Sequence, residues 1–353
     1  MYKRIILKIG SGVISNNGLL DEKVVKEIVR QIGALRRKGV GVVLVTSGAV
    51  ATGKKIVKVK KGADEIVQKQ VFAAVGQVRL MSIYAALFAK QKQACAQVLV
   101  TKEDFRDRQH YLNMKNCLEN LLRSDIVPVV NENDVIAVTE LVFTDNDELA
   151  ALLASQLGAE ALIILTSVGG VLRGRPDDPG AEVISRIESD DGAEKYITDE
   201  RSSSGRGGMH TKFAMAKKLA AQGIAVHIAN GKKRDTVTRI VAGEPVGTTF
   251  IPARKLSAAK RRIAHSEGLA KGSAYVNECT EDLLLSRKVA SLLPVGILRV
   301  EGTFEKGDVI EVKNEKGRRL GFGIARYDSL KARTLRGKKK APALVHYDYL
   351  FIQ

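Results

Sequence analysis

The stretch Arg4-Ile5-Ile6-Leu7-Lys8-Ile9, followed at once by Gly10-Ser11-Gly12, decides the fold of this 353-residue chain. Its apolar and β-branched side chains predict a buried strand, and the glycines mark the end of that strand. Glycine allows backbone amides to approach a phosphate closely, and a neighbouring lysine adds a fixed positive charge. The sequence therefore places a cation, Lys8, beside a turn suited to an anion.

Similar apolar runs recur through the first 230 residues and alternate with helical patterns. The expected strands are Arg4–Ile9, Val42–Thr46, Ala96–Leu99, Ile126–Val130, Ala161–Leu165 and Ala225–Ala229, and the expected helices are Asp21–Lys38, Val75–Lys90, Tyr111–Arg123, Asn146–Leu157 and Thr211–Gln222. Asp21 is a typical N-cap and Gly39 a typical residue just past a helix end. Nearly continuous apolar strands are typical of a parallel sheet covered on both faces. The prediction is an α/β fold with an open, mostly parallel sheet and helices on both faces.

The pattern changes after residue 252. We expect an α/β domain at 1–252, a basic, glycine-containing connector at 253–273 and a small, mostly β domain at 274–353. The expected strands of the small domain are Ile297–Val300, Asp308–Val312, Gly321–Ala325 and Ala343–Phe351, separated by lysine–glycine and arginine–glycine turns.

The charge and the composition limit the class of protein. The net charge is +18, and residues 251–353 hold 21 Lys and Arg against 11 Asp and Glu. This excess suits a nucleotide or RNA partner, although a solubilising surface explains it equally well. The three cysteines form no disulfide framework and the five histidines have no metal-ligand spacing. Lys8 interrupts the first apolar run too early for a signal peptide, so we expect a cytoplasmic protein without a membrane span.

Polar groups follow the other predicted strands, where ligands bind in open α/β sheets. Thr46-Ser47-Gly48-Ala49 follows the second strand, and Asn131-Glu132-Asn133-Asp134 follows the strand that ends at Val130. Asp145-Asn146-Asp147 opens one helix, and Gly205-Arg206-Gly207-Gly208-Met209-His210-Thr211-Lys212 opens another. Each motif alone is explained by an ordinary helix cap or turn.

The segment Gly48 to Lys55 nearly spells a P-loop, because Gly53-Lys54 follows a strand at the right spacing. A P-loop needs Ser or Thr at its last position, since that hydroxyl binds magnesium. Lys55 occupies this position, so we favour the other phosphate-binding signals.

Together and in this order, the motifs resemble the amino-acid kinase family and, within it, the glutamate 5-kinases. The resemblance rests on Lys8-Ile9-Gly10-Ser11, Val45-Thr46-Ser47-Gly48-Ala49, Gln68-Lys69-Gln70, Ala73-Ala74-Val75-Gly76-Gln77, Arg108 with Tyr111-Leu112-Asn113, Pro128 to Asp134, Asp145-Asn146-Asp147, Gly207-Gly208-Met209 and Thr211-Lys212. It covers essentially the whole chain.

The resemblance implies an ATP- and Mg²⁺-dependent kinase that phosphorylates the γ-carboxylate of L-glutamate, with proline as a feedback inhibitor and a dimeric or tetrameric assembly. It implies catalytic roles for Lys8, Gly10, Asp147 and Lys212, with Gly10 donating its N–H to the phosphates. It implies acceptor binding by Ser47, Gly48, Ala49, Asn131, Asp134 and Asn146, with Asp134 facing the α-ammonium group. It implies nucleotide binding by Lys8, Thr166, Ser167, Gly207, Gly208, Met209, Thr211 and Lys212, and no metal ligand from the protein.

The chain departs from the family pattern around the nucleotide. Thr166-Ser167 stands where the family usually has Thr-Asp, and Gly170-Val171-Leu172 replaces Gly-Leu-Tyr. The usual Asp-Pro is displaced to Arg175-Pro176-Asp177. These changes bear on the contacts to adenine and ribose and leave the lysines untouched.

The C-terminal region resembles a PUA domain, a small β-barrel found in RNA-modifying enzymes. The resemblance rests on Ser291 to Ile297, Val300 to Phe304, Gly307-Asp308-Val309 and Val345-His346-Tyr347-Asp348. It leaves two alternatives open: an RNA-binding protein with a secondary or inactive kinase domain, or a related kinase that acts on aspartate, acetylglutamate, uridylate or another small acidic acceptor.

Overall fold

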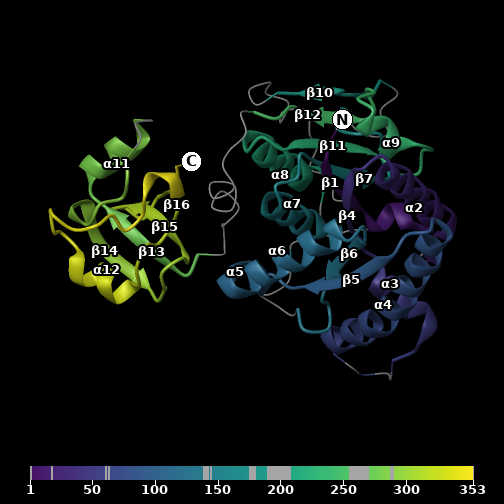
Figure 1. The fold of residues 1–353 in the computed structure, drawn as a ribbon, viewed down its shortest axis with the longest axis horizontal. Coiled ribbons are helices and arrows are strands. Elements are labelled where there is room, and N and C mark those ends of the chain that lie inside the picture. The colour runs from purple at the N-terminus through teal and green to yellow at the C-terminus, as the bar shows by residue number, and fades with distance from the viewer. Residues whose placement is uncertain are drawn as a thin grey trace. The chain divides into compact units, whose positions relative to one another are not determined.

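The computed structural model describes residues 2–16, 19–59, 62, 64–137, 143, 145–174, 180–188, 208–253, 270–286 and 290–352. The chain divides into two compact units, one of residues 1–102 and 115–255 and one of residues 103–114 and 256–353. Figure 1 labels most of the elements of both.

The first 250 residues contain the strands of a mostly parallel sheet, two separate two-stranded sheets and a set of helices. The strands are β1 (Arg4–Ile9), β2 (Ser15–Asn16), β3 (Leu19–Leu20), β4 (Gly41–Val45), β5 (Cys95–Val100), β6 (Val127–Glu132), β7 (Ala161–Thr166), β8 (Leu172–Arg173), β9 (Glu182–Val183), β10 (Arg186–Ile187), β11 (Ala225–Asn230) and β12 (Thr248–Phe250). The helices are α1 (Ser11–Ile14), α2 (Glu22–Arg37), α3 (Ala49–Ile56), α4 (Glu65–Lys90), α5 (Glu103–Arg106), α6 (Arg108–Arg123), α7 (Asn146–Leu157), α8 (Met209–Ala221) and α9 (Thr236–Val241).

The main sheet has eight strands in the order β10-β12-β11-β7-β1-β4-β6-β5. The strands from β11 to β5 all run parallel, while β12 pairs antiparallel to β11. Helices α7 and α8 pack on one face, and α2 and α9 pack on the other. The predicted fold class is confirmed.

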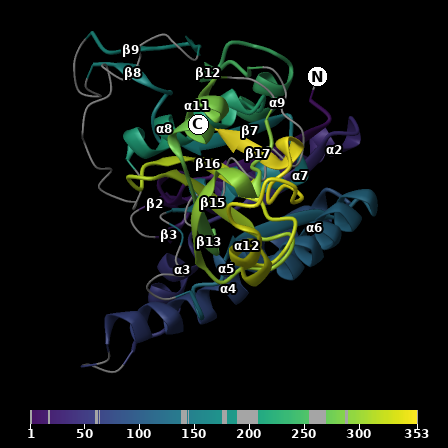
Figure 2. The same cartoon turned by 90° about the vertical axis from the view of Figure 1, so that its left-hand side faces the viewer.

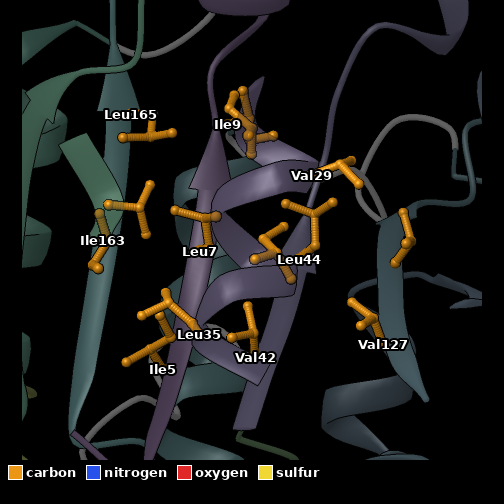
Figure 3. Packing of buried hydrophobic residues seen from close by; sticks show 14 of the residues in the cluster. Ile5, Leu7, Ile9, Val29, Leu35, Val42, Leu44, Val127, Ile163 and Leu165 are labelled. Carbon is orange, nitrogen blue, oxygen red and sulfur yellow. The ribbon is translucent and has the colours of Figure 1, made fainter. Parts of the chain in front are cut away.

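The strand β1 presents alternate side chains to the two faces of the sheet. Ile5, Leu7 and Ile9 pack in the same core cluster as Val29 and Leu35 of α2 (Figure 3). Because the alternation has a period of two, Lys8 points to the opposite face, where α7 and α8 lie. The apolar core on one face thus fixes the direction of the one buried lysine of this strand.

The end signals of α2 are those the sequence predicts. Asp21 accepts hydrogen bonds from the backbone N–H groups of Lys23 and Val24. At the other end Gly39 has φ +79°, and its N–H donates to Arg36 while Val40 donates to Leu35. This pair of bonds is a Schellman motif, which satisfies the last carbonyl groups of the helix.

Helix α4 begins ten residues before the expected start at Val75, capped by the side chain of Asp64. It lies against α3 (Figure 2), and two glycines allow this close approach. A Cβ on Gly76 would overlap the carbonyl oxygen of Ala49, and a Cβ on Gly53 would overlap that of Phe72. Gly53 therefore serves helix packing, which removes the P-loop alternative.

By length and apolar composition alone, α4 could cross a bilayer. Core helices of soluble proteins pass the same test, however, and α4 packs against α2, α3 and β5. Its side chains Tyr84 and Phe88 are fully buried in the core.

The small unit contains a five-stranded sheet in the order β14-β13-β15-β16-β17. Its elements are β13 (Gly272–Val276), α11 (Glu278–Leu285), β14 (Ile297–Gly302), β15 (Val309–Asn314), β16 (Arg319–Ile324), α12 (Ser329–Leu335) and β17 (Leu350–Ile352). Strand β13 begins inside the segment expected to be a connector, most of which lies outside the described residues.

The expected strand Ala343–Phe351 is wrong over most of its length. Only Leu350–Ile352 forms a strand, and Val345 makes an isolated bridge to Leu292. Residues Tyr347–Tyr349 form a 3₁₀ turn, in which the Asp348 N–H donates a hydrogen bond to the ring nitrogen Nδ1 of His346. This side-chain cap gives the backbone an alternative to pairing in the sheet.

We predict that His227 makes the unfolding free energy fall in acid. His227 on β11 is buried, and its ring nitrogens bond to the hydroxyls of Tyr2 and Thr249 at 2.8 and 3.0 Å. Burial lowers its pKa from 6.5 to about 4. Between pH 4 and pH 6.5, the unfolded chain therefore binds a proton at this histidine and the folded chain does not. The free energy of unfolding keeps its full value above pH 6.5 and falls by up to about 3 kcal/mol as the pH falls towards 4.

Urea unfolding of the wild type and His227→Gln across pH 4–7 tests this, with His110→Gln as the exposed control. The decline should be shallower in His227→Gln than in the other two proteins. Equal slopes in all three would contradict the assignment.

Candidate active site

The carboxyl ends of the parallel strands meet at one edge of the sheet, and the predicted site residues lie there. Strand β1 is central, with β4 on one side and β7 on the other. After β1, the strands β4, β5 and β6 are added on one side of it, and the next strand, β7, is added on the other side. In open α/β sheets, such a reversal of strand order leaves a crevice where ligands bind. Helices α7 and α8 carry Asp147 and Lys212 in their first turns.

Two lysines and one aspartate meet beside the end of β1. Lys8 Nζ lies 2.6 Å from Asp147 Oδ1, and Lys212 Nζ lies 3.1 Å from Asp147 Oδ2. The Asp147 residue is 2% exposed and Lys8 is 6% exposed. The structure therefore brings together three predicted catalytic residues that are about 200 positions apart in the chain.

The two ammonium groups determine the charge of Asp147. Burial alone would raise the pKa of its carboxyl group, but the charges of Lys8 and Lys212 outweigh burial and hold that pKa below its usual value. The pKa of the neighbouring Asp145 is raised by burial and by the negative charge of Asp147. Asp147 is therefore an ionised carboxylate that both ammonium groups contact, and the Asp145 carboxyl group lies close enough to interact with all three charges.

Asn146 connects this cluster to the end of β4. Its amide nitrogen lies 2.6 Å from the carbonyl oxygen of Thr46, 2.8 Å from Ser47 Oγ and 3.1 Å from Asn131 Oδ1. Asn146 precedes Asp147 on the first turn of α7, which Asp145 caps. The predicted acceptor residues Ser47, Asn131 and Asn146 therefore adjoin the lysine cluster.

Gln77 extends the same chain of hydrogen bonds, and the sequence analysis did not select it as a site residue. Asn131 Nδ2 donates to Gln77 Oε1 at 3.0 Å, deep in the unit. The close crossing of α3 and α4 at Gly76 places this glutamine beside the end of β6. The sequence feature that could have identified Gln77 is its position as a polar residue directly after the apolar run Ala73-Ala74-Val75-Gly76.

Asp134 pairs with α4 instead of joining the asparagine chain, which is the hydrogen-bonded set Asn146, Asn131 and Gln77. Its Oδ1 is 2.7 Å from Lys69 Nζ, and its side chain is 14% exposed. The loop also contacts α4 through Gln70, whose Nε2 donates to the carbonyl oxygen of Val135 at 2.6 Å. The structure thus places the predicted ammonium-binding carboxylate in an existing ion pair.

The expected hydrogen bond from Gly10 to a phosphate needs correction. The Gly10 N–H donates to the carbonyl oxygen of Leu165 at 3.0 Å, so the sheet already uses it. A Cβ at this position would come within 3.1 Å of the same carbonyl oxygen, so Gly10 allows the backbone to approach β7 closely at this point. The other predicted glycine, Gly48, has φ +103° and caps α3, which begins with the buried Ala49.

The predicted nucleotide residues lie at the ends of β7 and α8. Thr166 Oγ1 accepts a hydrogen bond from Val168 N–H, and the Ser167 carbonyl accepts one from Asn230 Nδ2 at 2.9 Å. Asn230 ends β11 and was missed, although it follows an apolar strand as the other site residues do. Gly208 caps α8, Met209 begins it and Thr211 Oγ1 donates to the Gly208 carbonyl. Gly207 lies outside the described residues.

The fold and the lysine–aspartate cluster define a phosphotransferase of the amino acid kinase family. The model of that family matches residues 3–230, and the chain belongs to it. The PUA domain model matches residues 272–347. The solved carbamate kinase from Giardia lamblia bound to AMP-PNP has the same fold, with a TM-score of 0.53 and 18% identity over 71% of this chain and 99% of that one.

Curated relatives place the chain more narrowly within the family. It is 46% identical to the glutamate 5-kinase of Bacteroides thetaiotaomicron, over all of this chain and 99% of the relative. It is 45% identical to the glutamate 5-kinase of Chlorobaculum tepidum, over all of this chain and 98% of the relative. Both domains are shared with these relatives, since the matches run the full length.

We predict that Asp147→Asn destabilises the protein, because it leaves the ammonium group of Lys8 buried without its anion. The free energy of unfolding at pH 7, measured in urea, should fall by about 3–5 kcal/mol. The double variant Lys8→Met/Asp147→Leu is the control, and removal of this buried ion pair should recover part of the loss, because Lys212 still loses its contact with Asp147. Equal free energies of unfolding for Asp147→Asn and the wild type would show that the ion pair of Lys8 and Asp147 does not stabilise the folded chain.

Proposed function

We propose that the chain transfers the γ-phosphoryl group of ATP to the γ-carboxylate of L-glutamate. The product would be L-glutamyl 5-phosphate, the activated intermediate at the start of proline synthesis, made in the cytoplasm. The observation that carries this proposal is the buried cluster of Lys8, Asp147 and Lys212 at the centre of the sheet edge. The full-length relatives named glutamate 5-kinase support the choice of acceptor.

For this reaction the protein has mainly to position the two substrates and to stabilise negative charge. A γ-carboxylate oxygen forms a bond to the γ-phosphorus, while the bond from that phosphorus to the β–γ bridging oxygen breaks and ADP leaves with the electron pair. The ammonium groups of Lys8 and Lys212 offset the negative charge on the transferring group. Asp147 holds both and does not react. The acceptor needs no general base, because a carboxylate is already ionised at neutral pH.

The residues present fit a metal ion that is held by phosphate and water. Among the described residues, no group of three or more His, Cys, Asp or Glu side chains could hold a metal ion. Both carboxylate oxygens of Asp147 already face lysines. Mg²⁺ bound to the phosphates would neutralise part of their charge, as hard cations commonly do on nucleotides.

The acceptor would lie between Asp134 and the asparagine chain. Ser47, Asn131 and Asn146 supply hydrogen-bonding groups beside the lysines, and Gly48 and Ala49 bring the first turn of α3 to the same edge. Proline carries an α-carboxylate and a positively charged α-nitrogen, as glutamate does, although its nitrogen is a secondary ammonium group. Competition by proline at this site is therefore part of the proposal.

Two further partners are proposed on surface features. A homo-oligomer is supported by the exposed apolar side chains of α4, which are Ile66, Val67, Val71 and Val78. RNA binding by the small unit is supported by its PUA family match and by its excess of basic residues. Neither feature replaces the kinase proposal, because neither accounts for the buried lysine–aspartate cluster.

The test traps the acyl phosphate as a hydroxamate in the presence of glutamate, ATP and Mg²⁺. We expect product with glutamate and far less with aspartate. Lys212→Ala should lower kcat by about 10²–10³-fold with little change in the KM for glutamate, since the lysine acts on the transferring group. Lys218→Ala, six residues further along α8, is the matched control and should retain activity.

Two outcomes would contradict the proposal. The absence of hydroxamate above the blank with the wild type would reject the reaction. Turnover of Lys212→Ala equal to that of Lys218→Ala would show that Lys212 does not act on the phosphoryl group.

A further inference from the structure

One face of α4 forms a wall of the proposed acceptor site. Lys69, Ala73 and Gln77 are spaced four residues apart, so their side chains lie on the same face of the helix. Gln77 bonds to Asn131 at 3.0 Å, and Lys69 pairs with Asp134 at 2.7 Å. The wall therefore contacts both ends of the segment Asn131 to Asp134, which spans the end of β6.

Gln77 indicates that this wall faces a polar ligand. The residue is 8% exposed, and its buried Nε2 atom has no hydrogen-bond partner among the described residues. A buried amide donor without a partner costs free energy, and such a group is usually satisfied by a bound water or ion or has a functional role. A carboxylate-bearing acceptor supplies the oxygen atoms that this donor needs.

The ion pair of Lys69 and Asp134 is not needed to hold the loop. Gln70 ties Val135 to α4, and the Asn133 N–H bonds to the Val100 carbonyl at 2.8 Å. The loop stays anchored when Lys69 leaves, because these two bonds involve neither charge. Lysine has a long flexible stem, so its ammonium group can move to another anion nearby.

The proposed acceptor brings a second cation to Asp134. When the α-ammonium group binds that carboxylate, Lys69 loses its anion while its side chain is only 27% exposed. An α-amino acid carries its own carboxylate on the carbon that bears the ammonium group. The exchange of one internal ion pair for two intermolecular ones then leaves no charge unpaired, which limits the desolvation cost.

We propose that Lys69 is a specificity-determining residue that leaves Asp134 on binding and pairs with the α-carboxylate of the acceptor. This inference rests on the proposed function and concerns the same site. An acceptor without the α-carboxylate leaves Lys69 unpaired, and one without the α-ammonium group cannot release Lys69 from Asp134. The site would thus select the zwitterionic end of glutamate through paired charges.

The test compares three acceptors that share the reacting carboxylate. Glutamate carries both α groups, 4-aminobutyrate lacks the α-carboxylate and glutarate lacks the α-ammonium group. Steady-state kinetics are measured for the wild type, for Lys69→Gln and for Lys90→Gln, a matched control at the exposed end of the same helix. Acyl phosphate is detected as its hydroxamate.

Lys69→Gln should raise the KM for glutamate about tenfold or more with kcat nearly unchanged, because binding rather than the transition state is affected. Its kcat/KM for 4-aminobutyrate should stay the same or rise, because no lysine is then left unpaired when this acceptor binds. The preference for glutamate over 4-aminobutyrate should therefore shrink about tenfold or more. Lys90→Gln should behave as the wild type does. A preserved kcat also shows that the variant is folded.

Two results would overturn the inference. An unchanged preference for glutamate over 4-aminobutyrate in Lys69→Gln would assign the α-carboxylate to other donors, such as the first turn of α3. A lowered KM for glutamate would show that Lys69 only competes with the ammonium group. Failure of the proposed function is distinguishable, since it appears as an inactive wild type, and the inference falls with it.

Discussion

The buried carboxylate of Asp147 between two lysines is the interaction on which the site depends. Lys8 is held by the central strand and Lys212 by the first turn of α8, so neither ammonium group is brought in by a loose surface chain. Asp147 is the carboxylate that contacts both ammonium groups, in a place that water barely reaches. Two ammonium groups held together in this way can stabilise further negative charge, and a transferring phosphoryl group would bring that charge.

The fold supplies this geometry through two simple constraints. The apolar contacts of Ile5, Leu7 and Ile9 with α2 orient β1, and the alternation of the strand then directs Lys8 to the opposite face. On that face, Asn146 and Asp147 are neighbours on one helical turn, one bonded to the end of β4 and the other to the lysines. In the proposed reaction, this single rigid element would position both the acceptor and the phosphate donor, which suits a reaction that depends on alignment.

The sequence predicted the α/β unit well, because its strands are continuous apolar runs whose ends carry the polar groups. It predicted the small unit less well, since short strands compete there with local caps such as that of His346. The contacts of individual residues could not be predicted from the sequence. The hydrogen bond of Gly10 to Leu165 and the ion pair of Lys69 with Asp134 form only when distant segments of the chain meet. The near P-loop shows the same limit, since the packing role of Gly53 needs the partner helix.

A crystal structure with ADP, Mg²⁺, glutamate and a planar aluminium fluoride mimic of the phosphoryl group tests the central claim most directly. The account predicts both ammonium groups, Lys8 Nζ and Lys212 Nζ, within hydrogen-bond distance of the mimic, with Asp147 still between them. A mimic bound elsewhere, or one approached by neither lysine, would contradict it.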